Sequence, residues 1–218
     1  MMTRRKFLTL TAFALPTAAY ANASWVEPTN ICVRELTLTP GGGARFVHFT
    51  DFHYKGDAEY AAEVIATINR QQPAFVCFSG DLVEDKAFAP AALNFIRQIK
   101  APVYGAPGNH DYLSQAPFPE YEKAFAETGG AWLVDCSVVV PNFDLEIVGL
   151  ALTSLQTLQS PPAAARRVLL LHYPVMADRL GDHLFDVLLA GHSHGGQVRV
   201  PFLGPLVLPE NVGPYDLG

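Results

Sequence analysis

The 218-residue sequence has few cysteines and few positive charges, and each shortage excludes a class of protein. Its three cysteines, Cys32, Cys77 and Cys136, are too few for a small domain held together by disulfides, and the odd number leaves at least one without a partner in the chain. A chain of this length in which half of the residues are hydrophobic is expected to fold around one apolar core.

Basic residues are outnumbered, with 15 lysines and arginines against 21 acidic residues. Arg4, Arg5 and Lys6 lie in the first 21 residues, which hold no acid, and removing these three leaves 12 basic residues for the remainder. This balance argues against a nucleic-acid polymer as the partner. An acidic protein that acts on phosphates must bring its own local positive charge, and bound metal ions are the usual source.

The N-terminus lacks a hydrophobic run long enough for a membrane span, but it resembles an export signal. Basic residues precede an apolar stretch, residues 7–14, and small residues offer Ala-x-Ala cleavage sites that end at Ala21 and Ala23. We therefore assign residues 1–23 as a signal segment and residues 24–218 as a single domain.

Residues 3–8, Thr-Arg-Arg-Lys-Phe-Leu, resemble a twin-arginine export signal, and an ordinary secretory signal is the alternative. Recognition by the twin-arginine export machinery is expected, because that pathway carries folded proteins and suits an enzyme that loads its metal before export. The expected location is the periplasm or the outer face of the cytoplasmic membrane. If the segment is retained, it would also associate the protein with the membrane.

Beyond this segment, short apolar runs alternate with stretches of helical character, such as residues 57–70 and 88–100. This rhythm predicts an α/β fold with sheets that are covered on both faces. Partial alternation also predicts an edge strand over residues 31–38, and shorter strands are expected at residues 137–140 and 145–150.

Polar side chains follow five of the apolar runs, at the point where each predicted strand ends. The runs are 46–50, 75–80, 103–108, 168–171 and 187–191, and the residues that follow them are Asp51-Phe52-His53, Asp81, Asn109-His110-Asp111, His172 and His192-Ser193-His194. The carboxyl ends of strands are where open α/β sheets place their ligands. Taken singly each motif is weak, but carboxylates, imidazoles and an amide gathered at one place would be costly without a cation to neutralise them.

In these five blocks, D-x-H, G-D, G-N-H-[DE], a lone H and G-H-x-H, the chain resembles the calcineurin-like metallophosphoesterase family. The longer motif from Gly191 to Arg199 is similar to an exported bacterial phosphodiesterase subgroup that also begins with a twin-arginine signal. The resemblance implies a four-layer α/β/β/α sandwich of two packed mixed β-sheets flanked by helices. It also implies strands after the last motif, so we expect the second sheet to be incomplete in a chain that ends at Gly218.

The resemblance implies that two divalent metal ions bind between the loops. One ion would be held by Asp51, His53, Asp81 and His194, and the other by Asp81, Asn109, His172 and His192, with the Asp81 carboxylate as the bridge. Two such ions clamp a phosphoryl group and generate a nucleophilic hydroxide between them. The set of oxygen and nitrogen ligands accepts manganese, iron or zinc.

Two further residues gain roles from the same resemblance. His110 would be the catalytic general acid or transition-state stabiliser near the leaving-group oxygen. Glu84, three residues after Asp81, would orient this histidine from the second shell, and a solvated carboxylate is the alternative.

The expected function is therefore that of a metal-dependent phosphoesterase that hydrolyses phosphodiester bonds by attack of a metal-bridging hydroxide. The runner-up is a pyrophosphatase for nucleotide sugars or lipid-linked precursors, so the expected substrates are small or lipid-linked phosphoesters or pyrophosphates. The alternative from another class is a binding module that uses this fold without catalysis.

Overall fold

The computed structural model describes residues 3–4, 30–38, 43–196, 199–200, 204–205, 208–210 and 212–215. Contacts within the chain group residues 43–218 as one unit, apart from residues 1–42. The signal segment predicted over residues 1–23 lies outside the described residues, except for Thr3 and Arg4. Within the described part of the chain, no helix is both long and apolar enough to cross a membrane.

The first sheet has four parallel strands in the order of the sequence. They are β1 (Phe46–Phe49), β2 (Phe75–Phe78), β3 (Val103–Gly105) and β4 (Ala131–Trp132). Every residue of β2 and β3 is buried, which explains why these segments are continuously apolar rather than alternating.

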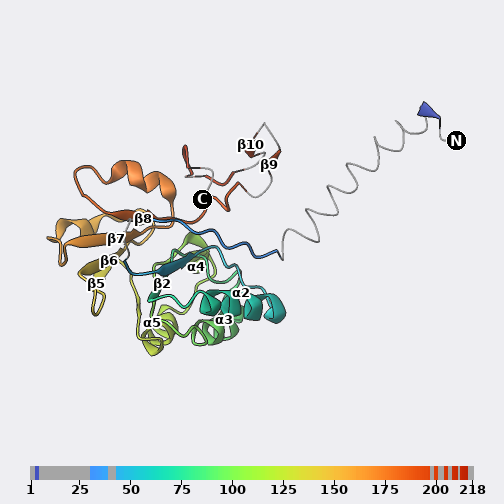
Figure 1. Ribbon diagram of the computed structural model, residues 1–218, viewed down its shortest axis with the longest axis horizontal. Coiled ribbons are helices and arrows are strands. Elements are labelled where there is room, and N and C mark those ends of the chain that lie inside the picture. The colour runs from blue at the N-terminus through green and yellow to red at the C-terminus, as the bar shows by residue number, and fades with distance from the viewer. Residues whose placement is uncertain are drawn as a thin grey trace. The chain divides into compact units, whose positions relative to one another are not determined.

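Helices cover the outer face of this sheet (Figure 1). They are α2 (Ala58–Arg70), η3 (Lys86–Phe88), α3 (Ala89–Ile96) and α5 (Phe118–Glu127). The short helix α4 (Asn109–Leu113) instead begins at the predicted ligand Asn109, after β3. Helix α2 begins where predicted, because the Asp57 side chain accepts a hydrogen bond from the Tyr60 backbone N–H at 3.0 Å and so caps the first turn.

The second sheet has four strands in the order β5-β6-β7-β8, and only its first pair is antiparallel. The strands are β5 (Cys136–Val139), β6 (Leu145–Gly149), β7 (Arg166–Leu170) and β8 (Val187–Leu189). The described residues add a separate two-stranded sheet of β9 (Arg199–Val200) and β10 (Gly204–Pro205).

Three apolar clusters account for a layered sandwich. One packs the first sheet against its helices, and a second joins the two sheets through residues such as Cys77, Tyr104 and Ile147. The third lies on the outer face of the second sheet, against the 3₁₀ helices η4 (Gln156–Gln159) and η5 (Pro174–Arg179). The predicted sandwich of two packed sheets is confirmed, and its second helical layer consists of these short 3₁₀ helices.

One local prediction was wrong, and one predicted helix is shorter than expected. Residues 31–38 form no strand, because alternation marks an edge strand only if a neighbouring strand pairs with it, and no pairing involves them among the described residues. The helix predicted over residues 88–100 starts as η3, capped by Asp85, and α3 ends at Ile96. Beyond Ile96 the chain tightens into turns, in which the Ile99 backbone N–H donates to the Ile96 carbonyl.

Candidate metal centre

Loops after β1, β2 and β3 bring the first group of polar side chains together. Asp51, His53 and Asp81 all have positive φ angles, of 51°, 41° and 62°, which non-glycine residues seldom adopt. Backbone hydrogen bonds hold this conformation, because the N–H groups of Asp51 and His53 donate to the carbonyls of Gly80 and Asp81 at 2.9 and 3.0 Å. Strain of this kind persists only where the surroundings fix it, as they do at functional sites.

The second sheet supplies three histidines from the ends of β7 and β8. His172 is fully buried and its Nδ1 lies 2.8 Å from the Ser79 carbonyl oxygen. His192 and His194 also have positive φ, of 68° and 49°. The backbone N–H of His192 donates to both carboxylate oxygens of Asp51 at 2.9 and 3.0 Å, which joins the two sheets at this point.

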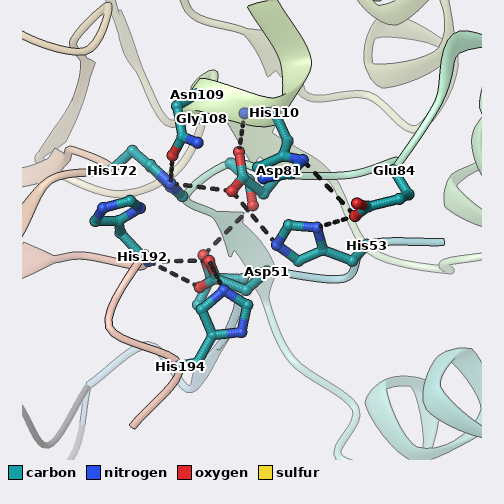
Figure 2. Close-up of polar contacts among 12 residues, drawn as sticks. Asp51, His53, Asp81, Glu84, Gly108, Asn109, His110, His172, His192 and His194 are labelled. Carbon is teal, nitrogen blue, oxygen red and sulfur yellow. Dashed lines mark hydrogen bonds and ion pairs between the residues drawn. The ribbon is translucent and has the colours of Figure 1, made fainter. Parts of the chain in front are cut away.

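Asp81 lies at the centre of the arrangement in Figure 2. Its Oδ1 accepts a hydrogen bond from the His110 backbone N–H at 2.7 Å. Its Oδ2 lies 3.2 Å from His172 Nε2 and 3.4 Å from His53 Nε2, yet neither Asp81 Oδ2 nor His53 Nε2 has a hydrogen-bond partner among the described residues. Buried polar atoms left in this state are costly unless another group satisfies them.

Side chains on either side of Asp81 form two groups that could each hold a cation. In each group the potential ligand atoms lie within 4.8 Å of one another. The groups are Asp51 with His53 and His194, and Asp81 with His172 and His192. Asn109 joins the second group, because its Oδ1 lies 2.9 Å from His172 Nε2. The structure thus brings all seven predicted ligands together. Asp81 belongs only to the second of these groups, and its Oδ2 lies 3.4 Å from His53 Nε2 of the first.

This donor set fits divalent cations. Carboxylates, imidazoles and an amide oxygen suit manganese, iron and zinc. The unsatisfied atoms, Asp81 Oδ2 and His53 Nε2, are the ones that a bound cation would contact. The backbone also lies very close to two of these carboxylates, at Gly108 and Gly191. A Cβ atom on Gly108 would lie 2.1 Å from Asp81 Oδ1, and one on Gly191 would lie 2.7 Å from Asp51 Oδ2, so a side chain at either position would displace one of these carboxylates.

A family model described as calcineurin-like phosphoesterase matches residues 44–196, which is more than half of the chain. The chain belongs to this family. Members of the family are metal-dependent phosphoesterases, which agrees with the two groups of ligands around Asp81. The matched segment contains both four-stranded sheets and all of the predicted site residues.

Two curated relatives match the whole chain. The uncharacterized metallophosphoesterase YkuE of Bacillus subtilis is 29% identical, with 85% of its own length covered. The phosphodiesterase YaeI of Escherichia coli is 28% identical, with 87% of its length covered. Among solved structures, the Pseudomonas putida nuclease MPE matches with a TM-score of 0.32 at 16% identity, over 56% of this chain and 58% of the nuclease.

Burial and neighbouring charges shift the pKa values of the candidate ligands. Burial alone would raise the pKa of Asp81, but the nearby His172 and His53, together with the hydrogen bond from the His110 backbone N–H, lower that pKa below its ordinary value. Burial likewise opposes the imidazolium form of His53, yet Asp81, Glu84 and Asp51 raise its pKa to about 8. Burial lowers the pKa of His192 and His194, which favours the neutral imidazole that binds metal.

His110 and Glu84 lie beside the first group of ligands. The His110 ring packs edge-on against that of His53, with centroids 4.6 Å apart. Glu84 Oε2 lies 2.8 Å from His53 Nδ1 and 3.7 Å from His110 Nδ1. The short contact of Glu84 is therefore with the predicted ligand His53, while its contact with His110 is longer than a hydrogen bond.

Asp111, for which no role was predicted, is fully buried beneath the centre. Its carboxylate accepts hydrogen bonds from the backbone N–H groups of Asp81, Leu82 and Gly108 at 2.9, 3.1 and 2.8 Å. It thereby ties the loop after β2 to the loop after β3, and burial raises its pKa to about 6. An acid three residues after a helix-capping glycine is the sequence signal that could have indicated this contact.

Proposed function

We propose that the protein is a dinuclear metal-dependent phosphodiesterase. The observation that carries this proposal is the position of the Asp81 carboxylate, buried between two groups of ligands, with its Oδ2 unsatisfied by the described residues. The name of the Escherichia coli relative, a phosphodiesterase that this chain matches over its full length, supports diesters as the substrate class.

The chain's own residues would divide the work as follows. One cation would be held by Asp51, His53 and His194, and the other by Asn109, His172 and His192. The carboxylate of Asp81 would bind both cations. When bound, the two cations would supply positive charge to the phosphoryl group and activate a water molecule for in-line attack. In this acidic protein, the positive charge that meets the phosphate would come mainly from the cations.

His110 is the proposed general acid. Its backbone N–H donates a hydrogen bond to Asp81, and its imidazole lies outside both ligand groups around Asp81, in a third group of potential ligand atoms with His53 and Glu84. A histidine so placed can donate a proton to the departing oxygen of the ester. Glu84 would act mainly through His53, whose Nδ1 it contacts, so that His53 Nε2 is directed toward the centre.

The decisive experiment combines elemental analysis with a substrate panel on protein reconstituted with manganese. We expect two ions per chain and turnover of a chromogenic phosphodiester that exceeds turnover of monoesters. Preferential cleavage of pyrophosphate links in nucleotide sugars or lipid-linked precursors would instead identify a pyrophosphatase. Absence of both metal and turnover would identify a binding module and contradict the proposal.

Two variants separate binding from catalysis. His110→Ala is expected to retain both ions and to lose about 10²-fold or more in kcat, because only the proton donor is removed. Asp81→Asn is expected to lose metal, because the bridging carboxylate becomes a weaker neutral ligand. Near-normal activity in both variants would overturn these assignments.

We further propose that residues 1–23 direct export of the folded, metal-loaded protein by the twin-arginine machinery. The support is the Thr-Arg-Arg-Lys-Phe-Leu sequence at residues 3–8. Replacing Arg4 and Arg5 together by lysine keeps the charge but removes the paired arginines, so cell fractionation should find the variant retained in the cytoplasm. Unchanged export of the variant would favour an ordinary secretory signal.

A further inference from the structure

His192 makes a contact that the two-cation arrangement does not require. Its ring Nε2 lies 2.6 Å from the backbone carbonyl oxygen of Glu210, 18 residues further along the chain. A carbonyl oxygen can only accept, so this bond places the hydrogen of the neutral imidazole on Nε2 and leaves Nδ1 bare. The ring is buried and packs edge-on against His172, with centroids 5.1 Å apart.

The segment that carries this carbonyl, residues 208–210 and 212–215, is here called the C-terminal latch. It lies beyond residues 44–196, the part that the family model matches. Two contacts hold it in place. Val212 is 2% exposed, and the Tyr215 hydroxyl donates a hydrogen bond to Asp178 Oδ1 at 2.6 Å.

The latch contacts η5, which follows the predicted ligand His172 in the chain. Asp178 belongs to η5, which begins two residues after the predicted ligand His172. Gly213 also lies against η5, because a Cβ atom there would be 3.3 Å from Val175 Cγ2. The latch therefore packs on the element that follows one histidine of the second ligand group and hydrogen-bonds the other.

We propose that the C-terminal latch is a positioning element of the metal centre, in which the Glu210 carbonyl fixes the tautomer and ring orientation of His192 so that Nδ1 faces the cation shared with Asp81, Asn109 and His172. This inference rests on the proposed function, because it assigns a cation to that group. Partners of this kind behind a ligating histidine typically change metal affinity or activity by about 10–100-fold.

The first test is to displace the latch in the full chain. Val212→Asp places a charge in a buried position, and we expect the ion held with His172 and His192 to bind at least about 10-fold more weakly while the ion held by Asp51, His53 and His194 remains. Leu184→Asp is the matched control, because the same substitution at a side chain that is 82% exposed should leave both affinities unchanged. Metal titration by calorimetry measures both ions.

A milder variant keeps the proposal testable if Val212→Asp does not fold. Tyr215→Phe removes only the hydrogen bond to Asp178, and should weaken the same ion by up to about 5-fold, which is the effect of one ordinary hydrogen bond. Equal loss of both ions, or of neither, in folded Tyr215→Phe would contradict the proposal.

The tautomer of His192 gives a readout that needs no metal. In the metal-free protein, nitrogen-15 NMR of the imidazole should show a single form protonated at Nε2, and Tyr215→Phe should shift it toward a mixture. A mixture of the two tautomers in the unaltered protein would contradict the proposal that the latch positions His192. If the unaltered protein bound no cation, the dinuclear proposal would fail, whereas the tautomer would still decide whether the latch positions His192.

Discussion

The two sheets contribute to the same centre but hold their side chains by different means. On the first sheet, the loops after β1, β2 and β3 are joined by backbone hydrogen bonds and by the buried Asp111 carboxylate, which takes three backbone N–H groups. On the second sheet, His172 bonds to a carbonyl of the first, and His192 bonds to Asp51 and to the Glu210 carbonyl. In the half of the molecule that contains the first sheet, the loops are held by contacts with one another. In the half that contains the second sheet, the histidines are held by contacts with other parts of the chain.

Burial explains this difference. The first sheet lies between helices and the second sheet, so its loops leave a core that is closed on both sides. Strand β8, which leads to His192 and His194, pairs only with β7 among the described residues, and Leu188 in its middle is 39% exposed. Local stability usually follows buried apolar contact. We therefore expect substitutions to cost more in the first half than at corresponding places in the second.

The largest effect is expected for Asp111→Ala. This change leaves three buried backbone N–H groups without an acceptor, so the free energy of unfolding should fall by about 4 kcal/mol. The matched control is Asp144→Ala in the second half, where an exposed carboxylate accepts a single backbone N–H, from Ala165. Its cost should stay below about 1 kcal/mol. Urea unfolding of the metal-free proteins measures both, and equal costs would contradict the comparison.

A glycine from each half gives the next largest difference. In Gly108→Ala the new Cβ would meet the Asp81 backbone nitrogen at 2.6 Å, whereas in Gly191→Ala it would meet the Thr50 Oγ1 at 2.2 Å. Backbone cannot move aside as a side chain can. We therefore expect the free energy of unfolding to fall by about 3 kcal/mol in Gly108→Ala and by about 1 kcal/mol in Gly191→Ala. Gly43→Ala, with nothing within 4 Å of the added Cβ, is the neutral control. If thermal unfolding showed that Gly191→Ala is more destabilising than Gly108→Ala, this interpretation would be wrong.

The acid sensitivity of the first sheet should depend on His48, in β1. Burial lowers its pKa to about 4, and its Nε2 lies 2.8 Å from Ser79 Oγ. The unfolded chain binds this proton with a pKa near 6.5, so below that pH the unfolded state takes up more protons and stability falls until about pH 4. His48→Gln should remove about 2 kcal/mol of the loss between pH 6.5 and 4.5.

The same measurement in His183→Gln provides the control for His48, because His183 is exposed in the second half. Its pH profile of unfolding free energy should match that of the unaltered protein. If His48→Gln also left the profile unchanged, the acid sensitivity would have to arise from other groups, and β1 would be less closed than its hydrogen bonds indicate.

Much of the fold was predictable because the strands that carry the ligands are apolar runs with abrupt polar ends. The runs before Asp51, Asp81, Asn109, His172 and His192 all contain strands, and the shorter strands near 137–140 and 145–150 were also predicted. Strand β4 was missed, since two residues carry no periodicity. It forms because Gly130 permits a close approach, where a Cβ atom would lie 1.9 Å from the Val103 carbonyl oxygen.

The candidate site was predictable in its ligands but not in the contacts that hold them. Side-chain chemistry at strand ends indicates which residues could bind a cation, so the seven predicted ligands lie together. Backbone partners such as the Glu210 carbonyl carry no residue-type signal, because every residue has one. The role of Glu84 shows the same limit, since the family resemblance implied that it orients His110, whereas its hydrogen bond is to His53.

The smallest effect is expected at the edge of the second sheet, and it tests the premise of the comparison. Leu188 in β8 pairs with Leu169 in β7, but Leu169 is fully buried and Leu188 is 39% exposed. Leu188→Thr should therefore lower the free energy of unfolding by less than about 1 kcal/mol, against about 3 kcal/mol for Leu169→Thr. Urea unfolding decides between them. If the two costs were equal, β8 would be covered in solution, and burial would not explain the difference between the two sheets.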